Sequence, residues 1–174
     1  MLLALLLACS LPETPVLVES PVLVETPPAV PEPSLGPPFP YDYVPRDLKG
    51  EKASFSQWVG QPVLVNLWAT WCGPCIQELP ALGALHGEWA PKGLVMLGVA
   101  VEDFPPKVEA TAKERGMAWV MLQDGAATTS KAFGADTLPV TLVYGKDGRL
   151  LYKHLGVVTA EDATLRAALE AAVR

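Results

Sequence analysis

The sequence predicts an α/β sandwich in which helices flank a mixed central β-sheet. Three patterns predict it: near-continuous apolar runs of strand length, segments with helical 3–4 apolar spacing between them, and a hairpin pattern near the C-terminus. Apolar runs without alternation are typical of strands that are covered on both faces. Such strands, alternating with helices, form a layered domain.

The first strand and helix of this domain surround a pair of cysteines. The run "PVLVNLWA" (62–69) has the length and composition of a buried strand. A helix is expected to begin around Cys72 and to end at about Trp89. Its apolar face is formed by residues spaced at three and four positions, namely Leu79, Leu82, Leu85 and Trp89.

Four further elements follow in alternation. "GLVMLGVAVE" (93–102) predicts a second buried strand, and "PPKVEATAKERG" (105–116) predicts a helix with proline in its first turn and glycine at its end. A short strand at 119–124 and a short helix at 127–134 come next. The alternation supports strand–helix–strand units.

The last elements are a hairpin and a helix. The strand at 140–144, the turn "GKDG" and the strand at 149–156 predict a β-hairpin. The segment 159–174 then predicts a closing helix, with Thr159 as its expected N-cap. The hairpin adds antiparallel strands, so the sheet is expected to be mixed.

The N-terminus has the pattern of an export signal. "LLALLLA" is too short to span a bilayer as a mature helix and fits the apolar core of a secretory signal. The following "LLAC" resembles a bacterial lipobox, which predicts a signal peptide at 1–8 and lipid attachment at Cys9. No Lys or Arg precedes the apolar run, so an ordinary cleaved signal or an uncleaved anchor remains an alternative.

Residues 9–40 are expected to be a proline-rich linker, and 41–174 the folded domain. Residues 12–40 hold 10 of the 18 prolines and no Lys or Arg. Closely spaced prolines favour an extended spacer. The domain itself is only mildly acidic and shows no basic patch, so nucleic acid is an unexpected partner.

The two cysteines of "WCGPC" predict thiol–disulfide exchange. Cys72 lies where the helix begins, and free N–H groups and the helix dipole there stabilise a thiolate, so its pKa is expected below the usual value. Cys75, one turn further on, is placed to resolve a mixed disulfide. This chemistry needs no cofactor.

Three alternatives compete with redox chemistry. A zinc site generally needs four ligands, and one CxxC motif supplies two. The only histidines, His86 and His154, show no ligand spacing. A copper-carrying domain that uses both thiols and His154 is the second alternative, and two inert core thiols are the third.

Around these cysteines the sequence resembles the thioredoxin superfamily. "WCGPC" after an apolar strand is similar to its active site, and Pro80 matches the proline inside its active-site helix. "TLPVTLVYGKDGRLLYKHLG" is similar to its downstream block, in which Pro139 would be the cis-proline. "LVNLWATWCGPCIQELPAL" and "VMLGVAVED" resemble most the TlpA/ResA-like branch of membrane-tethered extracytoplasmic reductants.

The resemblance implies a role for each matching residue. Cys72 would be the attacking nucleophile, Cys75 the resolving thiol, and the backbone of Leu138 beside Pro139 would pair with an extended substrate. Trp71, Gly73 and Pro74 would belong to the surface where partners dock. The Gly-Pro pair resembles that of reducing members.

Glu78 is the third expected catalytic residue. Cytoplasmic thioredoxins have a buried Asp on the first strand, where this chain has Asn66, whose amide cannot exchange a proton. A carboxylate matches Glu78 in the TlpA/ResA-like branch. Burial would raise its pKa and let it exchange protons with the resolving thiol. The alternative is a solvated glutamate on the helix surface.

The resemblance also implies partners and a location. The protein would be a lipid-anchored monomer on the extracytoplasmic face of a bacterial membrane, reduced by a thiol transporter of the CcdA/DsbD type. Its expected substrates are oxidised apocytochrome c or the copper-site cysteines of respiratory oxidases. The sequence does not choose between these substrates.

Overall fold

The computed structural model describes residues 35–174. Their sheet has six strands in the order β1-β4-β3-β2-β5-β6. The central strands β2 (Val63–Trp68), β3 (Val95–Val101) and β4 (Val120–Asp124) are parallel. β5 (Val140–Tyr144) and β6 (Leu150–Leu155) form the predicted antiparallel hairpin, and β5 pairs antiparallel with β2. The mixed sheet confirms the predicted fold.

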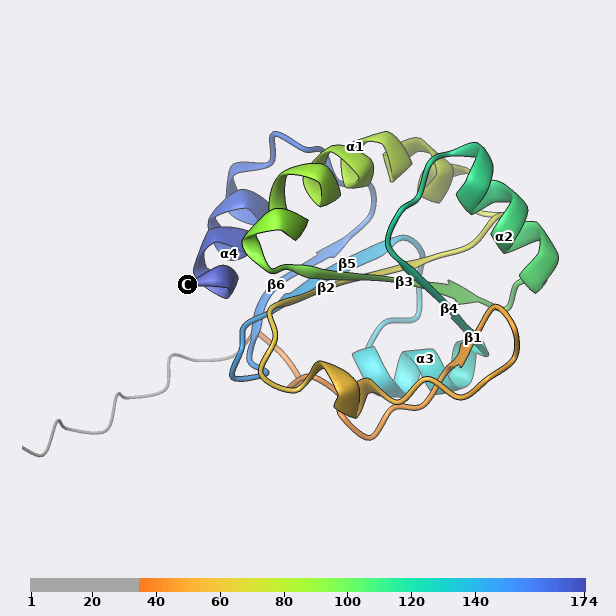
Figure 1. Ribbon diagram of the computed structural model, residues 1–174, viewed down its shortest axis with the longest axis horizontal. Helices are drawn as coiled ribbons and strands as arrows, with labels where there is room; N and C mark the ends of the chain where they lie inside the picture. Colours follow the sequence, from red (N-terminus) through yellow and green to blue (C-terminus); the bar gives the residue numbers. More distant parts are fainter. Residues whose placement is uncertain (1–34) are drawn as a thin grey trace, which may run out of the picture. The chain divides into compact units, whose positions relative to one another are not determined.

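Helices cover both faces of this sheet (Figure 1). On one face lie α1 (Gly73–Trp89), α2 (Pro105–Glu114) and α4 (Ala163–Val173), and on the other lies α3 (Ala126–Phe133). Single 3-10 turns precede β2 and follow α1, at Phe55–Trp58 and Ala90–Lys92. The described domain is thus a three-layer sandwich.

The alternation of side chains along β2 divides the interior into two cores. Leu64 and Trp68 pack on the side of α1, whereas Val65 and Leu67 pack with Phe55 and other residues on the side of α3. Because successive strand residues point to opposite faces, Asn66 points to the same side as Leu64 and Trp68. This direction places its amide beneath α1.

Two elements depart from the sequence prediction. β1 (Arg46–Asp47) pairs antiparallel with β4 and was not predicted, because two residues give no periodic pattern. Thr159 is not the N-cap of the last helix, so that prediction was wrong. Asp162 takes this position instead, since its carboxylate accepts the N–H groups of Thr164 and Leu165 at 2.8 and 2.9 Å.

The packed region begins before Tyr41. Phe39, which the sequence analysis assigns to the linker, is 3% exposed. Its ring lies 5.2 Å from the rings of both Phe55 and Tyr144, centroid to centroid. Phe39, next to the end of the proline-rich segment, therefore forms part of the core.

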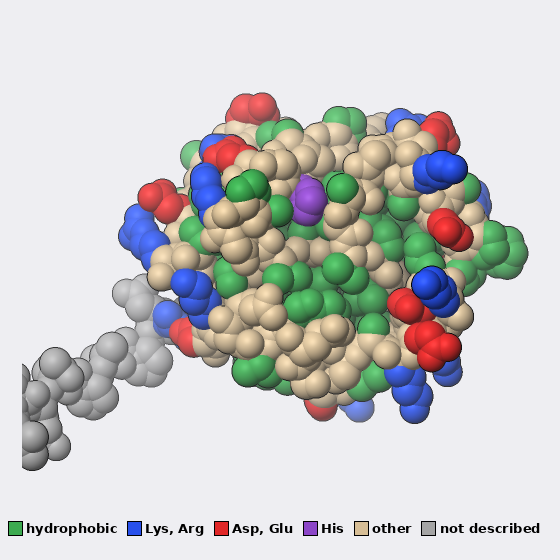
Figure 2. Space-filling view, in the orientation of Figure 1, with side chains coloured by type: hydrophobic (Ala, Val, Ile, Leu, Met, Phe, Trp, Pro, Cys, Tyr) green, Lys and Arg blue, Asp and Glu red, His purple; other side chains and the backbone are tan. Residues whose placement is uncertain are grey.

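Surface charge is dispersed. Lys and Arg side chains lie scattered among Asp and Glu side chains on the face shown in Figure 2. No described helix is long and apolar enough to cross a bilayer. The predicted signal peptide and Cys9 lie outside the described residues.

Candidate active site

The two cysteines form a disulfide at the N-terminus of α1. Cys72 is the N-cap residue, and its Sγ accepts the N–H of Cys75 at 3.3 Å. Cys72 is 7% exposed and Cys75 is fully buried. Cys72 is therefore the more accessible of the two cysteines, and its role as the attacking thiol, with Cys75 as the resolving thiol, stays a prediction.

Gly73 and Pro74 form the exposed first turn of α1 beside the disulfide. Proline is accommodated there because the first N–H groups of a helix have no partner within the helix. Pro80 lies inside the same helix. The start of the helix thus presents backbone N–H groups around Cys72, which favours its thiolate when the disulfide is reduced.

The segment before β5 borders the disulfide. The Leu138–Pro139 peptide bond is cis, as predicted. Leu67 pairs with Val140, which places Pro139 beside the end of β2 that leads to Cys72. Leu138 is partly buried and packs against the core cluster that contains both cysteines. The structure therefore brings the expected substrate-binding backbone to the redox pair.

Trp71 lies on the surface beside the disulfide. Trp71 is 58% exposed, so its ring is not part of the core. Its indole Nε1–H donates to the backbone carbonyl of Glu102 at 3.2 Å. This bond fixes a large apolar ring next to Cys72. Such an exposed aromatic is typical of a docking surface.

Glu78 is fully buried, which excludes the solvated alternative. It follows Cys75 by three residues, so both lie on one face of α1. Its Oε1 accepts from Asn66 Nδ2 at 2.8 Å, and its Oε2 accepts from the Val158 N–H at 3.1 Å. Each carboxylate oxygen has one donor from a distant part of the chain.

Burial raises the pKa of Glu78 from 4.5 to about 7, even though the hydrogen bonds from Val158 and Asn66 lower it. Desolvation penalises the charged form more than two neutral donors stabilise it. At neutral pH this carboxyl group therefore both accepts and releases a proton readily, which is the property that a general acid–base group needs.

Asn66 has a second contact and one unpaired atom. Its Nδ2 lies 3.4 Å from Thr141 Oγ1, and its Oδ1 is buried without a hydrogen-bond partner among the described residues. An amide rotated by a half turn would present this oxygen to Glu78. Asn66 is therefore able to pair with either a carboxylate or a carboxylic acid at position 78.

The copper hypothesis gains no support from the arrangement of ligands. Among the described residues, no three His, Cys, Asp or Glu side chains lie together as a metal-binding group. His154 stacks instead on Tyr152, with 6.3 Å between the ring centroids. Within residues 35–174, the cysteine pair therefore has no third metal ligand beside it.

Sequence analysis missed three contributors to the site. Val158 supplies a backbone N–H to Glu78, Glu102 anchors Trp71, and Asp103 accepts the N–H and hydroxyl of Thr70 just before the motif. A backbone donor leaves no trace in residue type, so Val158 gave no signal. The acidic pair at the end of a buried strand was the one available clue to the other two.

The family assignment rests on a match that covers about two thirds of the chain. Residues 35–153 match the AhpC/TSA family model. The chain belongs to the AhpC/TSA family. Within this thioredoxin-like family it is 31% identical over 121 residues to the thiol-disulfide oxidoreductase ResA of Geobacillus thermodenitrificans, covering 70% of each chain. This similarity agrees with the TlpA/ResA-like resemblance.

Two solved structures of thiol-disulfide exchange proteins show the same fold. A thiol:disulfide interchange protein from Chlorobium tepidum superposes with a TM-score of 0.65 at 23% identity, over 80% of this chain and 99% of that one. A secreted thiol-disulfide isomerase from Corynebacterium glutamicum gives 0.65 at 26% identity, over 76% of this chain and 81% of that one. The AhpC/TSA-family chain described here, with its Cys72–Cys75 pair, is a thiol-disulfide oxidoreductase.

Proposed function

We propose that the protein reduces disulfides of other proteins on the extracytoplasmic side of a bacterial membrane. The observation that carries this proposal is the asymmetry of the redox pair, in which Cys72 is slightly exposed and Cys75 is fully buried, one helical turn before Glu78. The Gly-Pro pair between the cysteines supports the reducing direction. The ResA relatives are named thiol-disulfide oxidoreductases, which agrees with exchange chemistry at this pair.

The proposed reaction begins from the dithiol form. The Cys72 thiolate attacks one sulfur of the substrate disulfide, forms a mixed disulfide and releases the other substrate sulfur as a thiolate. The Cys75 thiolate then attacks Cys72 Sγ, which restores the Cys72–Cys75 disulfide and releases the substrate as a dithiol. Two electrons pass to the substrate, and its two thiolates take up protons.

Glu78 is proposed to handle the proton of the resolving thiol. Cys75 is fully buried, so its thiol needs an internal acceptor to become the attacking thiolate. A carboxyl group with a pKa of about 7, one helical turn away, serves this purpose. In the reverse direction the same group returns the proton to the thiolate of Cys75.

Tethering is proposed to occur through a lipid on Cys9, with residues 9–40 as a spacer between membrane and domain. A membrane thiol transporter of the CcdA/DsbD type would regenerate the dithiol, because an extracytoplasmic reductant needs electrons from inside the cell. The proposed substrates are oxidised apocytochrome c or the copper-site cysteines of respiratory oxidases, and the protein is proposed to act as a monomer.

Replacing each cysteine separately tests the mechanism. Cys75→Ser should accumulate a mixed disulfide with the substrate, since attack still occurs but resolution does not. Cys72→Ser should form no adduct and is the matched control. Non-reducing electrophoresis detects the adduct, and normal turnover by Cys75→Ser would refute the two-cysteine mechanism.

The reduction potential tests the direction. A value near the roughly −270 mV of thioredoxin is expected, and a value near the roughly −120 mV of the strong oxidant DsbA would instead assign an oxidising role. Equilibration with glutathione or dithiothreitol buffers, followed by thiol alkylation, measures it. The measured potential tests only the direction of electron transfer, because a reductant and an oxidant both act by thiol–disulfide exchange.

A further inference from the structure

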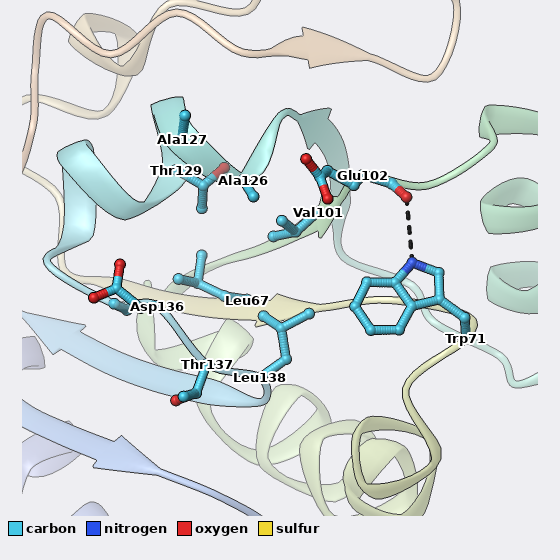
Figure 3. Close-up of a pocket in the computed structure, with 11 residues that line it drawn as sticks. Leu67, Trp71, Val101, Glu102, Ala126, Ala127, Thr129, Asp136, Thr137 and Leu138 are labelled. Carbon is cyan, nitrogen blue, oxygen red and sulfur yellow. Dashed lines mark hydrogen bonds between the residues drawn. The ribbon is translucent and has the colours of Figure 1, made fainter.

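A groove of about 400 Å³ lies beside the disulfide, and we call it the Trp71 groove. Trp71 forms one end and Asp136 lies at the other, with apolar side chains between them (Figure 3). Leu67, Val101 and Leu138 are the largest of these apolar residues. Leu138 both lines this groove and precedes the cis-proline, so the groove adjoins the backbone that is expected to pair with a substrate.

The charges on the groove have one sign. Glu102 and Asp136 line it, and no Lys, Arg or His is among its described lining residues. A neighbouring hollow shares Glu102 and adds Asp103 and Asp124, against the single cation of Arg46. The surface beyond Trp71 is therefore acidic around an apolar floor, which is complementary to an apolar side chain flanked by a cation.

The backbone holds Glu102 in a fixed position. Its φ of 49° is one that residues other than glycine rarely adopt, and such conformations persist where the surroundings impose them. The Glu102 N–H donates to the carbonyl of Asp124 at 2.9 Å, and its own carbonyl accepts from Trp71. Glu102 therefore holds the Trp71 ring through its carbonyl and contributes its own carboxylate to the lining of the groove.

We propose that the Trp71 groove binds a substrate segment next to the scissile disulfide, one that presents an apolar side chain beside Lys or Arg. This inference rests on the proposed function, because it describes how the same site selects among protein disulfides. The groove has the volume of a small-ligand site and accepts a few side chains rather than a folded domain. The negative charge of Glu102 and Asp136 favours a substrate with Lys or Arg next to the apolar side chain.

Binding of four peptides tests the groove without any redox step. Each peptide carries Ser in place of both cysteines of a CxxC loop, and the two flanking positions are Leu-Lys, Leu-Glu, Ser-Lys or Ser-Glu. Fluorescence anisotropy with the oxidised full chain should show the tightest binding for Leu-Lys. We expect about two- to fivefold for Lys over Glu, as for an exposed charge pair, and about tenfold for Leu over Ser.

Two variants and a control locate the effect. Glu102→Gln should remove most of the preference for Lys, and 1 M salt should do the same to the original chain. Ala127→Phe, at an exposed lining position on α3, should remove the preference for Leu. Glu109→Gln changes an exposed carboxylate on α2 away from the groove and should keep both preferences.

The outcomes separate the two proposals. Equal affinity for the four peptides would overturn the groove assignment, whatever the rates of exchange. So would a dimer in sedimentation velocity that Ala127→Phe abolishes, because the occupant would then be a second copy. Selective binding, combined with no reduction of the corresponding disulfide peptides by the dithiol form, would confirm the groove and refute the proposed reductase function.

Discussion

Replacing Glu78 by Gln should remove a pH-dependent loss of stability. Folding raises the pKa of this group from 4.5 to about 7 through burial. The folded protein therefore holds the proton more tightly than the unfolded chain does. Its contribution to stability is full below pH 4.5 and is lost as the pH rises through 7.

The size of this loss follows from the pKa values. One pKa unit corresponds to about 1.4 kcal/mol, so the change to about 7 corresponds to roughly 3 kcal/mol between pH 4 and pH 8. Glu78 is fully buried, so solvent screening does not reduce this figure greatly. The expected effect is a substantial fraction of the stability of an ordinary domain.

A glutamine side chain suits the site because Asn66 has an unused acceptor. In the Glu78→Gln variant the side-chain amide oxygen would accept the Val158 N–H, as Oε2 of Glu78 does at 3.1 Å. The new amide nitrogen would then face Asn66, whose buried Oδ1 has no partner among the described residues and is able to accept after a half turn of the amide. The substitution therefore removes the charge, and the amide N–H groups of Gln at position 78 and of Asn66 do not face each other.

Urea titrations of the oxidised protein at pH values from 4 to 8.5 measure the effect. The disulfide keeps both thiols from titrating, so the difference between variant and original chain reports Glu78. Between pH 4 and pH 8.5 the free energy of unfolding should decrease for both proteins. The decrease should be roughly 3 kcal/mol smaller for Glu78→Gln than for the original chain. Glu109→Gln, an exposed carboxylate on α2, should keep the original slope. Parallel curves for Glu78→Gln and the original chain would refute the assignment.

Three other substitutions give distinct outcomes. Asn66→Asp places a second carboxylate where the amide now donates to Glu78 at 2.8 Å. Repulsion between the two carboxylates should raise the pKa of the pair and steepen the loss of stability above pH 5. An unchanged pH slope in urea titrations would contradict this. Phe39→Ala should cost about 3–5 kcal/mol in the same titrations, whereas the exposed Leu35→Ala should cost less than about 0.5 kcal/mol. Cys9→Ala should move the protein from the membrane fraction to the soluble fraction, because acyl chains contribute about 0.8 kcal/mol of membrane-binding free energy per buried methylene. A processed variant that stays in the membrane would exclude the lipid anchor.

The sequence by itself determined the elements with strong local patterns. The apolar run of β2, the 3–4 spacing of α1 and the CxxC motif at their junction depend on residues that are neighbours in the chain. Local propensity and burial are therefore enough to predict them. The cis-proline at Pro139 was predicted differently, from the resemblance of the segment around it to the thioredoxin superfamily.

Only the tertiary structure decided the environment of the chemistry. Glu78 meets Asn66 from β2 and the N–H of Val158, which lies 80 residues further along the chain. A pKa depends on the burial and the donors that such distant segments supply, and no local pattern encodes them. The same reason accounts for the contact between Trp71 and Glu102, which are 31 residues apart. The sequence identifies the cysteines expected to react, and the packing of remote segments sets the burial of Glu78 and the position of Trp71.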